Sequence, residues 1–114
     1  MAKYEQILHG HFDEVLEMCE GAVLDGSVSA SYEDGSDYDR NGVRVAVRVY
    51  ERYSAFGGNR VSLNLTLMGK GEEIFLSAIT SGGSQAVFFK INTLGEESFL
   101  DTLKSAVEKW ISSS

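Results

Sequence analysis

The sequence predicts an α+β fold, in which an antiparallel five- or six-stranded meander sheet has an N-terminal and a C-terminal helix packed on one face. Apolar residues recur at helical spacing near both ends of the chain, and between them the pattern changes to alternation interrupted by short turns. Short turns require antiparallel neighbours, because a parallel return needs a crossover of a dozen or more residues. The expected order is β-α-β-β-β-β-β-α, in a single domain over residues 1–114.

The N-terminal part of the chain predicts a strand and then a helix. Residues 3–8 form the expected strand. After Gly10, apolar residues at 12, 15, 16, 19 and 23 lie on one helical face, which predicts an amphipathic helix over 12–24. Gly26 is expected to end this helix.

Two hairpin strands are expected next. Residues 27–32 alternate serine with larger side chains and predict a strand, while 33–42 predict a polar hairpin loop. Asn41 and Gly42 form the favoured pair for a two-residue turn at the end of that loop.

The strongest alternation follows. In the strand predicted over 43–52, valines occupy the odd positions from 43 to 49, and arginines, alanine or tyrosine the even ones. After a turn at 54–59, Val61 and three leucines alternate with Ser62, Asn64, Thr66 and Met68 in the strand expected over 61–68. Two further strands are expected at 73–80 and 87–91, after turns at 69–71 and 81–84. The first of these two is apolar on both faces, as in a strand that is central or covered on both sides.

The last predicted element is an amphipathic helix over 94–111. Thr93-Leu94-Gly95-Glu96 matches a capping box, in which threonine and glutamate side chains satisfy free backbone donors at a helix start. The apolar face of this helix consists of Phe99, Leu100, Leu103, Ala106, Val107, Trp110 and Ile111.

If the valine and leucine series both point toward the helices, the other sheet face is open and is the place for a binding function. The expected binding residues on it are Arg44, Arg48, Tyr50, Arg52, Ser62 and Asn64. They suit an anionic small ligand, an acidic protein or a second copy of the chain. A solvated face without function explains the same residues, because antiparallel sheets commonly leave one face in water.

Charge and cysteine content restrict the partners. The net charge of -7 repels phosphate backbones, so no nucleic-acid partner is expected, although five arginines lie between residues 40 and 60. The lone Cys19 cannot form an internal disulfide, which indicates a reducing compartment. No signal-peptide or membrane-spanning run is present, so cytoplasmic localisation without a membrane partner is expected.

No catalytic residue, metal or cofactor is expected. Asp37, Asp39 and Asn41 reproduce the first half of a calcium loop, but Arg48 stands where its bidentate glutamate should be, and a hairpin explains them equally. His9 and His11 lack further histidine or cysteine ligands for zinc. The glycine-rich segment 80–85 lies between predicted strands, whereas a phosphate cradle opens a helix.

Five segments together resemble a family of short bacterial proteins of unknown function: SVSAS (27–31), NGVR (41–44), VRVYERYS (47–54), GGNRVSLN (57–64) and AITSGGSQ (78–85). This resemblance implies no activity. The closing segment FKINTLGEE (89–97) is similar to the last strand and helix of small bacterial proteins with a TBP-like sheet, which implies an α/β sandwich with one exposed sheet face.

A non-enzymatic binding or self-assembly module that uses the open sheet face is the favoured function. Two alternatives stay open. One is a helix-grip-like carrier of a small apolar ligand, and the other is a small enzyme with a site near the glycine-rich turns.

Overall fold

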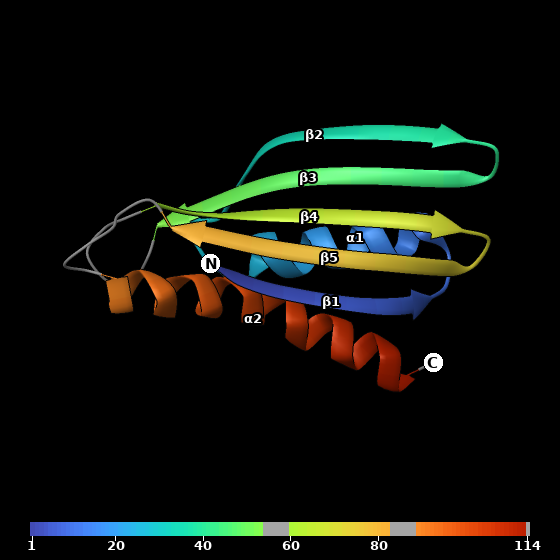
Figure 1. Ribbon diagram of the computed structural model, residues 1–114. Coiled ribbons are helices and arrows are strands. Elements are labelled where there is room, and N and C mark those ends of the chain that lie inside the picture. Colours follow the sequence, from blue (N-terminus) through green and yellow to red (C-terminus); the bar gives the residue numbers. More distant parts are fainter. Residues whose placement is uncertain (54–59, 83–88, 114) are drawn as a thin grey trace.

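The computed structural model describes residues 1–53, 60–82 and 89–113, and this part of the chain forms five strands and two helices. In chain order they are β1 (Ala2–His9), α1 (Phe12–Asp25), β2 (Ser31–Arg40), β3 (Val43–Tyr53), β4 (Arg60–Lys70), β5 (Glu73–Gly82) and α2 (Phe89–Ser113) (Figure 1). All strand pairs are antiparallel, in the order β1-β5-β4-β3-β2. Strands β2 to β5 form a meander and β1 is added beside β5, which confirms the predicted α+β fold and the strand at the N-terminus.

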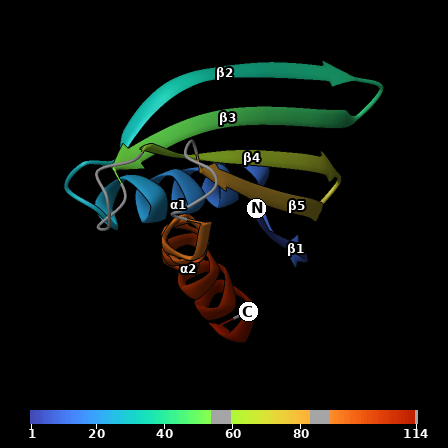
Figure 2. The ribbon, with the colours of Figure 1, turned by 60° about the vertical axis from the view of Figure 1, so that its left-hand side comes forward.

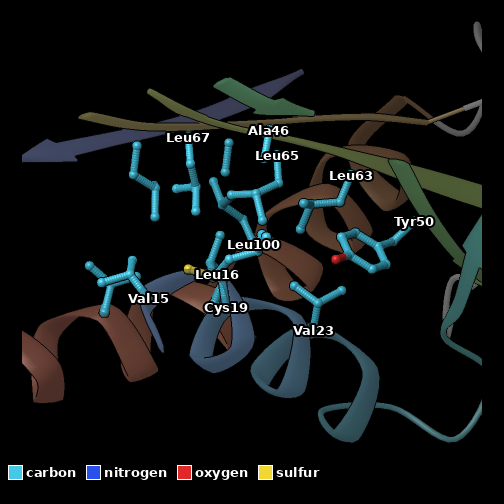
Figure 3. Packing of buried hydrophobic residues seen from close by; sticks show 14 of the residues in the cluster. Val15, Leu16, Cys19, Val23, Ala46, Tyr50, Leu63, Leu65, Leu67 and Leu100 are labelled. Carbon is cyan, nitrogen blue, oxygen red and sulfur yellow. The ribbon is translucent and has the colours of Figure 1, made fainter. Parts of the chain in front are cut away.

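Both described helices lie on the same side of the sheet, and no helix formed by the described residues covers the other side (Figure 2). The core fills the space between the two layers. From α1 it takes Val15, Leu16, Cys19 and Val23, which meet the inward-facing leucines of β4 (Figure 3). Phe99, Leu103 and Val107 of α2 complete it. The helix predicted over 12–24 is therefore confirmed, with the buried face that its periodicity indicated.

Gly26 follows α1 directly, as expected for a helix end, but its backbone is right-handed, with φ of -74°. Glycine is needed here for its small size and not for a left-handed backbone. A Cβ atom at Gly26 would lie 2.7 Å from Cβ of Thr102, so the end of α1 can approach α2 only because no side chain stands between them.

The region before β3 differs from the prediction. The strand expected at 27–32 and the polar loop expected at 33–42 are wrong, because β2 runs through Ser31–Arg40. Asn41 and Gly42 do form the turn, with φ of 53° and 81°. This tight turn places the polar segment directly beside β3, where it forms the edge strand β2. Both faces of this edge strand lie largely in water, so it needs no alternation of apolar and polar residues.

The start of the last helix also differs. α2 begins at Phe89, so the strand expected over 87–91 is wrong for its described residues, and Thr93 and Glu96 lie inside the helix instead of at a capping box. Five residues are too few to separate strand from helix periodicity. Glu96 is buried and accepts a 2.9 Å hydrogen bond from the amino group of Met1.

The β4–β5 turn lies two residues later than expected, at Gly71 and Glu72, and Gly71 has φ of 61°. Gly69 is inside β4, where the Phe12 ring occupies the space that a Cβ atom would need, 2.6 Å away. The turn expected at 54–59 lies outside the described residues. Of the turn expected at 81–84, residues 81 and 82 belong to β5 instead, and residues 83 and 84 lie outside the described residues.

Candidate interaction surface on the uncovered sheet face

The pairing of β3 with β4 decides which side chains share a face. Tyr50 lies opposite Leu63, and Val49 lies opposite Asn64. Directly opposite residues on antiparallel strands point to the same side of the sheet. The even-numbered residues of β3 therefore share the helix-covered face with the leucines, while the valines point to the uncovered side.

The expectation that one open face carries all six binding residues is consequently wrong. Four of them face the helices: Arg44, Arg48, Tyr50 and Arg52. Ser62 and Asn64 do lie on the uncovered face. Figure 3 shows Tyr50 pointing from β3 into the core, beside Leu63 and Val23.

Arg48 and Tyr50 belong to a polar network between β3, β2 and α1. The buried Tyr50 hydroxyl donates a 2.8 Å hydrogen bond to Glu20 of α1. Arg48 lies 3.4 Å from the same carboxylate through Nε and 3.0 Å from Asp37 of β2 through a terminal nitrogen. Its side chain is only 13% exposed, so the network holds the hairpin against the helix instead of presenting a free cation.

The titration of these groups follows from their surroundings. Burial and the hydrogen bond to Glu20 raise the pKa of Tyr50, which keeps its hydroxyl protonated. Burial acts to lower the pKa of Arg48, but the hydrogen bond and charges of Asp37 and Glu20 outweigh it and raise the pKa. Both groups keep one charge state near neutral pH and have no property expected of an acid–base catalyst.

The other two arginines lie over aromatic rings of the helices. Arg44 lies 4.4 Å from the Phe12 ring centre and makes a 2.7 Å ion pair with Asp13. Arg52 lies 4.6 Å from the Phe99 ring centre. Its Nε is buried and has no hydrogen-bond partner within residues 1–53, 60–82 and 89–113, and burial lowers the pKa of Arg52. An anionic ligand at Arg44 or Arg48 would have to displace a carboxylate of the protein.

The uncovered face carries an apolar row that crosses the whole sheet. One side chain from each strand contributes to it, in the spatial order Ile7, Phe75, Met68, Val45 and Tyr38. Five adjacent strands place its ends about 19 Å apart. Met68 at the centre is 47% exposed, and Ile7 and Tyr38 at the two ends are more than half exposed.

A second apolar series meets this row at right angles. It is the valine series of β3, half-buried by its neighbours, which consists of Val43, Val45, Val47 and Val49. Ile79 of β5 lies on the same face, next to Asn64. Charged side chains surround these residues, with Lys3 and Asp34 on the two opposite edge strands and Glu73 beside Lys70.

Sequence reasoning did not identify this surface, although two signals for it exist. The segment 73–80 is apolar on both faces, and Phe75 and Ile79 are its residues on the uncovered side. The second signal is the pairing of odd with even residues between β3 and β4, which alternation within one strand cannot reveal.

The candidate metal ligands do not converge. Asp37 is engaged by Arg48, and Asp39 is an exposed residue at the end of β2. Within residues 1–53, 60–82 and 89–113, no three His, Cys, Asp or Glu side chains come close enough to hold a metal ion. Cys19 is buried, and burial together with the charge of Glu20 raises the pKa of its thiol to about 12. A thiol in this environment is unreactive.

Comparison with known proteins places the chain in a family. Residues 1–111 match the family described as a family of unknown function, DUF6054. The chain belongs to this family. Neither a curated protein nor a solved structure matches it significantly, so the family description is the finding that comparison adds. For this DUF6054 member, neither described helix is long and apolar enough to cross a membrane.

Proposed function

We propose that this DUF6054 protein is a non-enzymatic self-assembly module, whose uncovered sheet face binds the same face of a second copy. The observation that carries the proposal is the apolar row from Ile7 to Tyr38, which joins the β3 valines on a face without a helix. Contiguous exposed apolar surface of this extent is uncommon on monomeric proteins and is typical of an interaction site.

The size of the face agrees with a small dimer interface. The five strands run side by side over about eight residues, and at a spacing of about 4.8 Å they give a face of roughly 600 Å². Two such faces bury about 1,200 Å² in total, which is at the lower end of the range for specific interfaces.

The arrangement of side chains supports a second copy as the partner. A two-fold axis along β4 stacks β3 on the partner's β5 and β2 on the partner's β1, and it makes the interface self-complementary. Three apolar pairs then form across the interface, Val45 with Phe75, Val49 with Ile79 and Tyr38 with Ile7, and one pair of opposite charges forms at its edge, Asp34 with Lys3. Met68 lies on the axis and meets its own copy.

The carrier alternative has less support. A carrier needs a cavity of several hundred Å³ for its ligand. Here the space between sheet and helices holds the packed core, in which Leu63, Leu65 and Leu67 are fully buried (Figure 3). Leu103 of α2 is fully buried as well. For the enzyme alternative, most of the glycine-rich turn segments lie outside the described residues.

A charge placed at the centre of the row tests the proposal. We expect Met68→Glu to abolish self-association in sedimentation velocity runs, because two carboxylates would be desolvated against each other. Val28→Glu is the matched control, since Val28 is fully exposed and outside the sheet, and the net charge changes equally. Circular dichroism checks that both variants fold. A wild-type chain that stays monomeric at high concentration, or a dimer that survives Met68→Glu, would overturn the proposal.

A further inference from the structure

A groove runs between α1 and α2 on the side turned away from the sheet. One section of about 510 Å³ is lined by Met18, Ala106 and Trp110, with Lys109 and Ser113 of α2 at its end. A second section of about 560 Å³ shares the same three residues and extends along α1. The groove is therefore open along α1 and has an apolar floor. This is the shape that receives one face of an amphipathic helix in helix-in-groove recognition.

Gly21 lines this groove in the middle of α1, where the fold itself gives no reason for a glycine. A glycine inside a helix lowers stability by about 1 kcal/mol relative to alanine. A Cβ atom at Gly21 would touch only the Asp25 carboxylate, at 3.9 Å, which is an ordinary contact. Gly26 differs, because Thr102 occupies the space beside it. The space at Gly21 is thus left open toward the groove, where a partner backbone can approach closely.

The acidic residues of α1 divide into two groups. The helix has five of them and no basic residue. Asp13 and Glu20 engage Arg44 and Arg48 of β3. The other three line the groove, and they are Glu14, Glu17 and Asp25. The wall of the groove formed by α1 is therefore negative, and the part of the chain that the structure describes supplies no salt bridge to it.

We infer that the α1–α2 groove binds a cationic amphipathic helix of another protein. Apolar side chains of that helix would enter beside Met18 and Trp110, its backbone would approach over Gly21 and Ala22, and its lysines or arginines would meet the acidic wall. A second copy of the chain is a poor occupant, because α1 carries five acidic residues and no basic one and α2 carries more acidic than basic residues.

This inference stands apart from the self-assembly proposal, because the groove and the uncovered face lie on opposite sides of the molecule. If both hold, the dimer presents two grooves pointing outward. A partner with two such helices would then bind through both sites and gain affinity by avidity.

The test uses a synthetic peptide of about five helical turns, with leucines at helical spacing and lysines elsewhere. Its control is a peptide of the same composition in scrambled order, which keeps the charge and removes the apolar stripe. Isothermal titration calorimetry measures binding of both peptides to the full chain. We expect the amphipathic peptide to bind at least tenfold more tightly than the scrambled one.

Two pairs of variants locate the site. Gly21→Leu fills the groove and favours helix, so we expect an unchanged or higher melting temperature together with at least tenfold weaker peptide binding. Ser105→Leu makes the same kind of change at an exposed position of α2 outside both groove sections, and we expect binding to be retained. Glu14→Lys with Glu17→Lys should weaken binding, whereas Asp39→Lys with Glu72→Lys, an equal change in charge, should weaken it far less.

Equal loss in both charge-reversed variants, or equal binding of the scrambled peptide, would show mere attraction to an acidic protein and overturn the inference. Retained affinity in Gly21→Leu would overturn it as well. All titrations are repeated with Met68→Glu in the background. Binding of one peptide per chain that persists in this variant would show that the groove binds the peptide independently of dimerisation.

Discussion

At the scale of single residues, the three arginines of β3 show how similar side chains on one strand face can have different roles. Arg48 joins three elements through Glu20 and Asp37 and also donates hydrogen bonds to the carbonyl oxygens of Ser36 and Val47. Among the residues that the structure describes, Arg52 donates one hydrogen bond, to Ser98, and its Nε has no partner. Hydrogen bonds and ion pairs therefore offset most of the desolvation cost of Arg48. For Arg52, part of the desolvation cost is not offset.

This difference predicts unequal costs of substitution. Arg48→Met removes the cation from between two carboxylates, and we expect the free energy of unfolding to fall by about 1–3 kcal/mol. Arg52→Met keeps the apolar contact with Phe99 and removes an unsatisfied donor, so we expect a change below about 1 kcal/mol. Urea denaturation at neutral pH measures both. Equal losses in the two variants would contradict the assigned roles.

At the scale of elements, two glycines predict opposite effects for the same substitution. Gly69→Ala places a Cβ atom 2.6 Å from the Phe12 ring, and Arg44 lies 4.4 Å from the centre of the same ring. We expect this overpacking to lower the free energy of unfolding by about 1–3 kcal/mol. The Cβ atom added by Gly21→Ala makes only an ordinary contact. The gain in helix propensity should therefore raise the free energy of unfolding by about 0.5–1 kcal/mol. Thermal unfolding compares the two, and a destabilised Gly21→Ala would show that the groove position carries a hidden packing role.

The faces of β3 and β4 show how far elements can be predicted from the sequence. Alternation identified both strands, and it identified which side chains of each strand share a face. It could not identify which face of β3 joins which face of β4, because that depends on the register of their pairing. Tyr53 pairs with Arg60, so odd residues of one strand lie opposite even residues of the other. A register changed by one residue would have put the valines beside the leucines.

The same limit explains the misplaced binding residues. Ala46 and Tyr50 reach the core because α1 covers that side of β3, and Arg44 and Arg48 on the same strand face extend to the rim of the helices. Arginine at alternate positions looks like a solvated face in the sequence. In the structure these arginines lie at the border of the helix-covered face. Only the position of the helix distinguishes such a border from a solvated face.

At the scale of the whole molecule, the composition and the two periodicities were sufficient for the fold class, the two helices and four of the five described strands, β1, β3, β4 and β5, whereas most of the polar strand β2 was expected to be a loop. The pairing of elements that are adjacent in the sequence could be predicted, because it depends on local periodicity and turn residues. The position of β1 at the far edge beside β5 is a contact between residues about 70 apart, such as Ile7 and Phe75, and no local pattern encodes it. The apolar row depends on that contact and on the β3–β4 register, so it becomes visible only in the folded sheet.

The central claim is that two copies stack through the uncovered face with Met68 near the two-fold axis. Chemical cross-linking tests it most directly. Stacked sheets lie about 10 Å apart, so a short bifunctional thiol reagent, and not a disulfide, should join Met68→Cys chains. The native Cys19 is buried, with a thiol pKa raised to about 12, and does not compete. We predict rapid covalent dimers for Met68→Cys and few for the exposed control Val28→Cys. Equal yields from the two variants would contradict the account.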